Sequence, residues 1–296
     1  MIALLHPVAQ LSLREFSVHP STTIGIGLFA AAYLWRVRQG PSAADLSPAG
    51  LETPSIAVDV LPGPTGAQQL SFFTSLALLF FTLNGPLHDL SDFYLFSGHM
   101  VQHLILTLIV PPLMVFGTPG WMLRPLLRVP ALFRVARKFT TITWCFTLFN
   151  LVLAFWHLPP MYNMALASHP VHILQHLMFI SASVLMWWPL MSPLPELPRA
   201  AYPAQMLYCF LMVIPMSIIS IYIAMADTLL YPAYAAAPRI MGITPMQDQQ
   251  YGGLIMWIPG GVFFYAVMTV VFFKWSARGE DTEASAQVGW IPGAQT

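Results

Sequence analysis

The sequence predicts an all-α integral membrane protein, a seven-transmembrane-helix bundle with its N-terminus outside and its C-terminus in the cytoplasm. Three observations support this prediction: the composition, the number of long apolar stretches and the distribution of basic residues. Of the 296 residues, 57% are hydrophobic and 8% are charged, whereas a soluble domain carries about 25% charged residues. The chain therefore has too few charged groups to cover a soluble surface.

Seven apolar stretches are long enough to cross a bilayer as helices, which takes about 20 residues. They lie near residues 20–36, 67–86, 95–116, 138–156, 170–190, 204–226 and 251–274. The first sixteen residues lack a basic segment, a long apolar run and a small-residue cleavage site, so they do not resemble a removed signal peptide. We expect an outer segment with the first span (1–37), a Pro/Gly-rich cytoplasmic linker (38–66), a six-span core (67–275) and a polar cytoplasmic tail (276–296), disordered at its end.

The basic residues predict the orientation, because lysine and arginine are enriched on the cytoplasmic side. With the N-terminus outside, ten of the twelve basic residues lie on the cytoplasmic side, and only Arg14 and Arg239 lie on the other. The same arrangement puts all nine histidines in the outer half of the membrane or beyond it.

A histidine pattern occurs twice near the outer ends of spans. HMVQH, which begins at His99, returns 73 positions later as HILQH, which begins at His172. Residues four apart share a helix face, so His99 and His103 form one pair, and His172 and His176 form another. An imidazole in hydrocarbon is costly unless it is paired or bound. Two helices that bring such pairs to one depth therefore predict a shared ligand.

A purely structural polar cluster is the alternative to this ligand site. Gln102 and Gln175 lie on a neighbouring face of each helix and could supply interhelical hydrogen bonds. Single interfacial histidines usually bond to carbonyls or lipid headgroups, and we interpret His6, His19 and His169 in that way. Further members of the site are expected at the outer ends of two other spans, at His88 and His157.

The positions of the carboxylates argue against a transport path. The acidic residues near the spans lie at outer span ends or outer loops, namely Asp89, Asp92, Asp227 and Asp248. A proton- or cation-driven transporter usually needs an acidic group near the midplane. The sequence therefore favours a binding site on the outer face over a tunnel, with Asp248 expected either to cap a helix or to orient a ligand.

The available ligand atoms favour copper over zinc. Imidazole binds zinc, copper and iron, whereas thiolate and thioether groups select Cu(I). Cys145 and Cys209 lie in the cytoplasmic halves of their spans and cannot reach the histidines. Methionine is abundant, with 17 residues, and Met100 and Met256 lie at the outer level. The expected cargo is copper, as Cu(I), with zinc as the alternative.

Four stretches carry a resemblance to a known family. FSGHMVQHLILTLIVPPLMVFGTP (96–119), WHLPPMYNMAL (156–166), HILQHLMFISASVLMWWP (172–189) and DQQYGGLIMWIPGG (248–261) resemble, in order, the signature stretches of the polytopic CtaG family of cytochrome c oxidase assembly factors. The resemblance covers residues of roughly 67 to 275. Gly98 stands where we expect alanine in this family.

The resemblance implies a multi-pass protein of the bacterial inner membrane with a periplasm-facing copper function. It implies that copper is handled for the Cu(B) centre in subunit I of the oxidase, with a periplasmic copper chaperone as a further partner. No nucleic-acid partner and no enzymatic activity are expected. The residues that match the family's motifs are His99, His103, His157, His172, His176, Asp248, Met256 and Trp257.

Two other functional classes stay open from the sequence. A seven-span zinc hydrolase also uses HxxxH and an aspartate at one membrane face, although it keeps HxxxH in the last span, which holds none here. A bis-histidine haem protein could use His103 and His176 as axial ligands. HExxH protease chemistry is excluded, because Met100 occupies the glutamate position.

Overall fold

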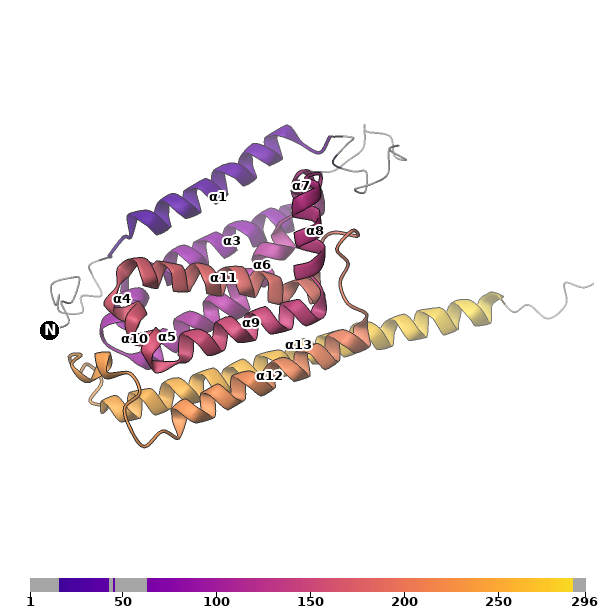
Figure 1. Cartoon of the computed structure of the whole chain (residues 1–296). Coiled ribbons are helices and arrows are strands. Elements are labelled where there is room, and N and C mark those ends of the chain that lie inside the picture. Colours follow the sequence, from indigo (N-terminus) through magenta and orange to yellow (C-terminus); the bar gives the residue numbers. More distant parts are fainter. Residues whose placement is uncertain (1–15, 43–44, 46–62, 290–296) are drawn as a thin grey trace, which may run out of the picture.

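The computed structural model describes residues 16–42, 45 and 63–289, with side chains described up to residue 278. Every regular element in these ranges is a helix, and the long helices run in roughly one direction (Figure 1). The all-α class is therefore confirmed. His6, most of the linker and the last seven residues of the tail lie outside the described ranges.

The long helices lie close to the predicted spans. They are α1 (Pro20–Gln39), α3 (Gly66–Thr82), α9 (Ile142–His157), α11 (His169–Met191), α12 (Tyr202–Ala224) and α13 (Pro245–Gly289), and the third span is made of α5 (Phe96–Leu104), the π-helix η2 (Ile105–Ile109) and α6 (Val110–Gly117). By length and apolar composition, four of the described helices could cross a membrane, or six when each of two bent helix pairs is taken as one span. Since α1 is not among them, the count of seven spans stays a prediction.

Short helices close the two ends of the bundle. At one end lie α4 (Pro86–Phe93), α10 (Pro159–Ala167) and the 3-10 helix η3 (Pro232–Ala235), and at the other α7 (Gly120–Leu127) and α8 (Pro130–Phe139). The helices α7 and α8 run across the direction of the long helices (Figure 1). The chain bends by 77° between α8 and α9.

The bend between α8 and α9 shifts the start of the predicted fourth span from 138 to Ile142. Lys138 belongs to α8, where its ammonium group lies 5.0 Å from the centre of the Trp144 ring. Arg134, Arg137 and Lys138 are costly to bury in hydrocarbon. These three charges explain why the chain turns at this point.

The predicted second span breaks before its expected end. Helix α3 ends at Thr82 and the chain resumes as α4 with a bend of 46°. Gly85 in the break has a φ of +72°, a left-handed conformation that glycine adopts without penalty, and Pro86 then suits the first turn of α4. The break turns α4, with His88, across the end of α3.

The third span contains a π-helix directly after His103. Because proline has no N–H, Pro111 cannot donate to the carbonyl of Thr107, its usual helical partner. The indole Nε1 of Trp187 in α11 donates to that carbonyl instead, at 2.9 Å. The irregular turn thereby links the two helices that carry the paired histidines.

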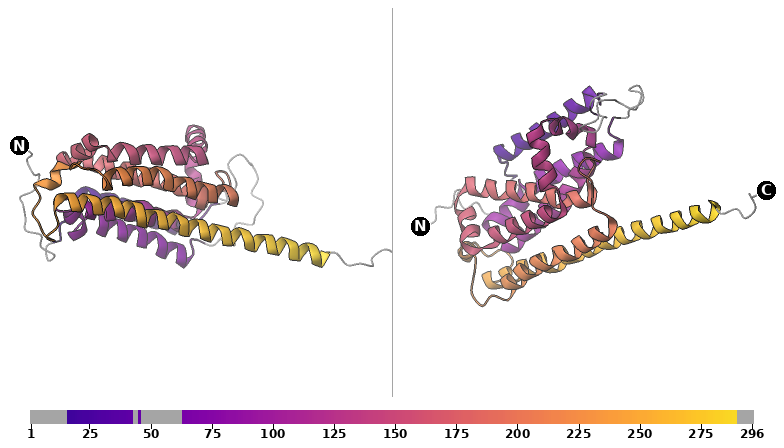
Figure 2. Two further views of the ribbon diagram at one scale, coloured as in Figure 1. Left: turned by 90° about the horizontal axis from the view of Figure 1, so that it is seen from below. Right: turned by 45° about the vertical axis from the view of Figure 1, so that its right-hand side comes forward.

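Helices α12 and α13 pack side by side along most of α12 (Figures 1 and 2). Helix α13 continues to Gly289, past the predicted end of the last span at 274, and its C-terminal part projects beyond the bundle (Figure 2). The polar tail thus begins as a helical continuation. The glutamate, alanine and glutamine residues in GEDTEASAQ are good helix formers and are compatible with this continuation.

Candidate metal centre

The two predicted histidine pairs converge between α5 and α11. The ring centres of His99 and His103 lie 4.2 Å apart, and those of His172 and His176 lie 4.4 Å apart. Across the helices, the ring centres are 6.0 Å apart for His99 and His172 and 5.8 Å apart for His103 and His176. The pairs therefore face one another rather than lipid.

Two further histidines extend this arrangement at its ends. The ring of His88 lies 5.9 Å from that of His172, and the ring of His157 lies 6.2 Å from that of His103. All six rings are buried. We call this set the histidine cluster: His88, His99, His103, His157, His172 and His176.

Most ring nitrogens of the histidine cluster have no hydrogen-bond partner among the described residues. Both nitrogens of His99, His103 and His176 are buried and without such a partner, as are Nε2 of His157 and Nε2 of His172. A buried polar atom without a hydrogen bond is destabilising, and native proteins keep few of them. So many in one place make the histidine cluster a candidate site for a ligand held through imidazole lone pairs.

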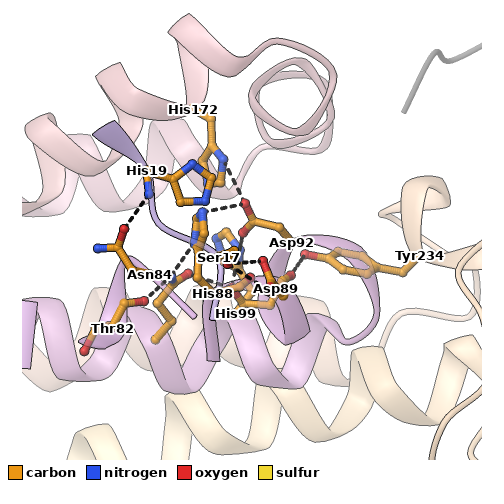
Figure 3. Close-up of polar contacts among 12 residues, drawn as sticks. Ser17, His19, Thr82, Asn84, His88, Asp89, Asp92, His99, His172 and Tyr234 are labelled. Atoms are coloured by element: carbon orange, nitrogen blue, oxygen red, sulfur yellow. Dashed lines mark hydrogen bonds and ion pairs between the residues drawn. The ribbon is translucent and has the colours of Figure 1, made fainter. Parts of the chain in front are cut away.

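Asp92 at the end of α4 supplies a carboxylate to the histidine cluster (Figure 3). Its oxygens lie 3.2 Å from Nδ1 of His172, 3.4 Å from Nε2 of His88 and 3.9 Å from Nδ1 of His99. Ligand atoms of Asp92, His99 and His172 all lie within 4.8 Å of one another. These three residues could hold one metal ion, and the sequence analysis did not include Asp92 in the site. Its position four residues after His88 on one helix face was the available signal.

His19 lies beside the histidine cluster, and His169 lies next to His19. The ring of His19 lies 4.5 Å from that of His88 and 5.9 Å from that of His169, which is exposed. The His19 backbone N–H donates to Asn84 (Figure 3). Burial, together with the neighbouring His88, lowers the pKa of His19 to about 4. At neutral pH this imidazole is therefore uncharged.

Tyrosines form one wall of the site. The Tyr162 ring lies 5.1 Å from that of His99, and its hydroxyl shares a 2.9 Å hydrogen bond with Tyr234, which donates to the carbonyl of Ser91 (Figure 3). Burial raises the pKa of Tyr234 well above its usual range, so it remains a donor. The sequence analysis missed this wall because Tyr234 comes from the short helix η3 in the connection between α12 and α13.

The two glutamines differ in their surroundings. Gln102 donates to the carbonyl of Thr82 at 2.8 Å, accepts from Ser91 at 3.0 Å and lies 3.1 Å from Nδ1 of His88. Gln102 therefore makes the interhelical hydrogen bonds expected of a purely structural polar cluster. Gln175 is buried, and neither side-chain polar atom has a hydrogen-bond partner in the described part of the chain. Interhelical hydrogen bonding therefore accounts for Gln102 and not for Gln175.

Comparison with known protein families shows which family the chain belongs to. Residues 59–278 match the family of cytochrome c oxidase caa3 assembly factors (Caa3_CtaG). This chain belongs to that family. The match confirms the resemblance to CtaG and includes the whole histidine cluster, and it relates the chain to assembly of the oxidase. Comparisons with curated proteins and with solved structures found no match.

Asp248 acts on the CtaG-family site through helix α5. Its carboxylate accepts from the backbone N–H of Phe96 at 2.7 Å, from the backbone N–H of Ser97 at 3.1 Å and from the Ser97 hydroxyl. A carboxylate at these first amides is a favourable cap. The structure thus makes Asp248 a cap, but of the helix that carries His99 rather than of its own helix.

The two methionines singled out from the sequence lie beside His103 and His157. Met100 and Met256 are buried and line a small cavity together with His103 and His157. Trp257, the neighbour of Met256 in the family motif, is partly exposed and does not line this cavity.

Proposed function

We propose that this CtaG-family protein binds copper as Cu(I) in its histidine cluster and transfers it to the Cu(B) centre in subunit I of cytochrome c oxidase. The observation that carries the proposal is the set of buried ring nitrogens without hydrogen-bond partners. Neutral imidazoles are good ligands for copper and zinc. In an oxidase assembly factor, copper is the cargo that this chemistry suits.

A periplasm-facing site in the bacterial inner membrane follows from the orientation that we propose for the chain. With seven spans and the N-terminus outside, ten of the twelve basic residues face the cytoplasm, in line with the positive-inside rule. The histidine cluster then opens toward the side where a periplasmic copper chaperone could deliver the ion. Activity of a reporter fused after Gly289 only in the periplasm would show that the orientation is the opposite of the proposed one.

Copper would arrive from the exposed side, where His169 and His19 lead toward His88. The ring separations along this path are 5.9 and 4.5 Å. Each ring is thus close enough to the next to pass an ion between imidazoles by ligand exchange. Such stepwise exchange needs reversible ligation and no catalytic base, so we propose a carrier rather than an enzyme.

A zinc-dependent hydrolase is the second candidate, and Asp92 is the observation that favours it. A carboxylate with two histidines is a ligand set of catalytic zinc, and Asp92 lies within 3.2 to 3.9 Å of His172 and His99. Ester or amide hydrolysis by the purified zinc-loaded protein, lost in Asp92→Asn, would favour the hydrolase. The haem hypothesis is not carried forward, because the cavity beside His103 measures about 20 Å³ and a porphyrin does not fit there.

Anaerobic Cu(I) titration of the purified full chain tests the proposal. We expect the double variant His99→Ala, His176→Ala to bind Cu(I) at least tenfold more weakly, because it removes four of the buried nitrogens without hydrogen-bond partners. The matched control is Leu174→Ala, which truncates an exposed side chain on the same helix as His176 and should leave the affinity unchanged. Equal affinity together with an equal number of bound Cu(I) ions in the double variant and the wild type would reject the proposal.

Copper content of the oxidase tests the cellular part of the proposal. In cells that carry only His103→Ala or His176→Ala, the oxidase subunits should be present but short of copper, while the variant still inserts into the membrane. Full copper content of the oxidase in those cells would contradict the transfer role even if the purified protein binds copper.

A further inference from the structure

The inner end of the histidine cluster opens onto a cavity with an unusual lining. The cavity has a volume of about 20 Å³, which is enough for one water-sized particle. Two imidazoles, His103 and His157, and three thioethers, Met100, Met216 and Met256, line it. Five ligand-type side chains from α5, α9, α12 and α13 thus surround a space of the size of one ion.

Both imidazoles that line this space have buried ring nitrogens without a hydrogen-bond partner among the described residues. Nδ1 of His157 donates to the carbonyl of Leu153 at 2.7 Å, which leaves Nε2 as the bare, buried nitrogen. Such a backbone contact to the other ring nitrogen is typical of metal-binding histidines. A metal–nitrogen bond of about 2.0 Å, plus roughly 1.1 Å from nitrogen to ring centre, puts two ligating rings about 6 Å apart when they oppose each other. The rings of His103 and His157 lie 6.2 Å apart.

Gly260 of α13 makes room for one of the thioethers. A side-chain carbon built at Gly260 would lie 2.9 Å from both the sulfur and the methyl group of Met216. Contacts near 2.9 Å are too close for packed carbon atoms. Helix α13 therefore has no side chain at the point where Met216 needs the space.

The rest of the lining is neutral. Hydrocarbon side chains complete it, together with Thr107, whose hydroxyl is used in a 2.7 Å bond to the carbonyl of His103. A divalent ion in such surroundings would lack a compensating carboxylate. A soft monovalent ion bound by imidazole and thioether suits them, and Cu(I) prefers these ligands.

We propose that His103, His157, Met216 and Met256, with Met100, form a second, inner Cu(I) site that is separate from the outer site of Asp92, His99 and His172. This inference rests on the proposed function, in which copper reaches the histidine cluster from outside. The outer site, which contains a carboxylate, accepts divalent ions as well as Cu(I). The inner site is selective for Cu(I), because its lining provides soft, uncharged ligands.

X-ray absorption at the copper edge of the anaerobic, Cu(I)-loaded full chain tests the inner site directly. We expect sulfur neighbours at about 2.3 Å, by analogy with other metal–sulfur bonds. The double variant Met216→Leu, Met256→Leu nearly conserves side-chain volume. It should lose most of the sulfur signal, because only the Met100 thioether remains, and bind Cu(I) at least tenfold more weakly at this site. Met186→Leu is the matched control, a buried methionine outside the lining, and should change neither result.

A second variant separates the inner from the outer site. Asp92→Asn with His172→Ala should abolish Co(II) binding at the outer site and keep the copper–sulfur signal, whereas the methionine variant should keep Co(II) binding. Copper bound with nitrogen neighbours alone in the wild type would overturn the inner site and leave the proposed function standing. A wild-type protein that binds no Cu(I) would overturn both.

Discussion

At the scale of single residues, hydrogen bonding separates supporting side chains from candidate ligands. Gln102 uses both ends of its amide in hydrogen bonds, so it fixes the position of α5 relative to α3 and α4. His103 lies one residue further along the same helix, and neither of its ring nitrogens has a hydrogen-bond partner in the described ranges. Neighbouring residues of one motif therefore have different roles.

Asp248→Asn should destabilise the protein by weakening the start of α5. The two carboxylate oxygens accept from different amides, Oδ2 from Phe96 and Oδ1 from Ser97. Asparagine keeps one acceptor and turns an NH₂ group toward the other amide. Hydrogen bonds to a charged group contribute about 1.5–3 kcal/mol, so we expect a clear fall in Tm of the purified protein in detergent.

Asp248→Ala should lower the Tm further than Asp248→Asn, because it removes both acceptors. Cu(I) affinity should fall in the same order, since α5 carries His99 and His103. An unchanged Tm in both variants would show that the cap does not stabilise the protein.

At the scale of elements, small residues decide how closely helices approach. A side-chain carbon built at Gly253 in α13 would lie 2.8 Å from both the backbone nitrogen and Cβ of Ala224 and 2.9 Å from the carbonyl oxygen of Ser220. Small residues at such crossings are typical of packed membrane helices. Contact with rigid backbone leaves no flexible side chain that could move aside.

Gly253→Ala should therefore force α12 and α13 apart and lower stability by about 1–3 kcal/mol, the usual range for overpacking. Gly261→Ala is the matched control, because its added carbon would lie 3.6 Å from a methyl carbon of Val213 on the same partner helix. The control should keep or raise the Tm. Equal Tm values for the two variants, measured in one detergent, would contradict this packing argument.

Most of the long helices could be predicted from the sequence, because apolar length identifies them. The histidine pairs could be predicted as well, since four-residue spacing fixes a helix face. The contribution of Asp92 could not, because it depends on the break at Gly85 that turns α4 across the bundle. Tyr234 joins the site from η3 in the connection between α12 and α13, and no periodic pattern indicates the path of such a connection.

At the scale of the whole molecule, the two ends of the bundle have different chemistry. Helix α1 begins just after His19 at the histidine end and runs to Arg36 at the other end. There Arg36 and Arg128 contact the carboxylate of Asp45 at 3.2 and 2.9 Å, and Arg124 donates to the Asp45 carbonyl at 2.9 Å. Asp45 thus joins Arg36 of α1 to Arg124 of α7 and to Arg128, the residue that follows α7.

Asp45→Asn should reduce stability, with a pH dependence of known sign. Burial alone would raise the pKa of the Asp45 carboxyl, but hydrogen bonds from Ser42 and Arg36 outweigh burial and hold it below the usual 3.8. A carboxyl with a lowered folded-state pKa contributes stability that is complete above 3.8 and is lost as the pH falls through the folded-state value. We expect the Tm difference between wild type and variant to be constant from pH 7 to 5 and to shrink below 3.8. The control variant Asp227→Asn, at an exposed position, should leave the Tm unchanged at every pH. A Tm difference for Asp45→Asn that does not shrink in acid would contradict the ion-pair explanation.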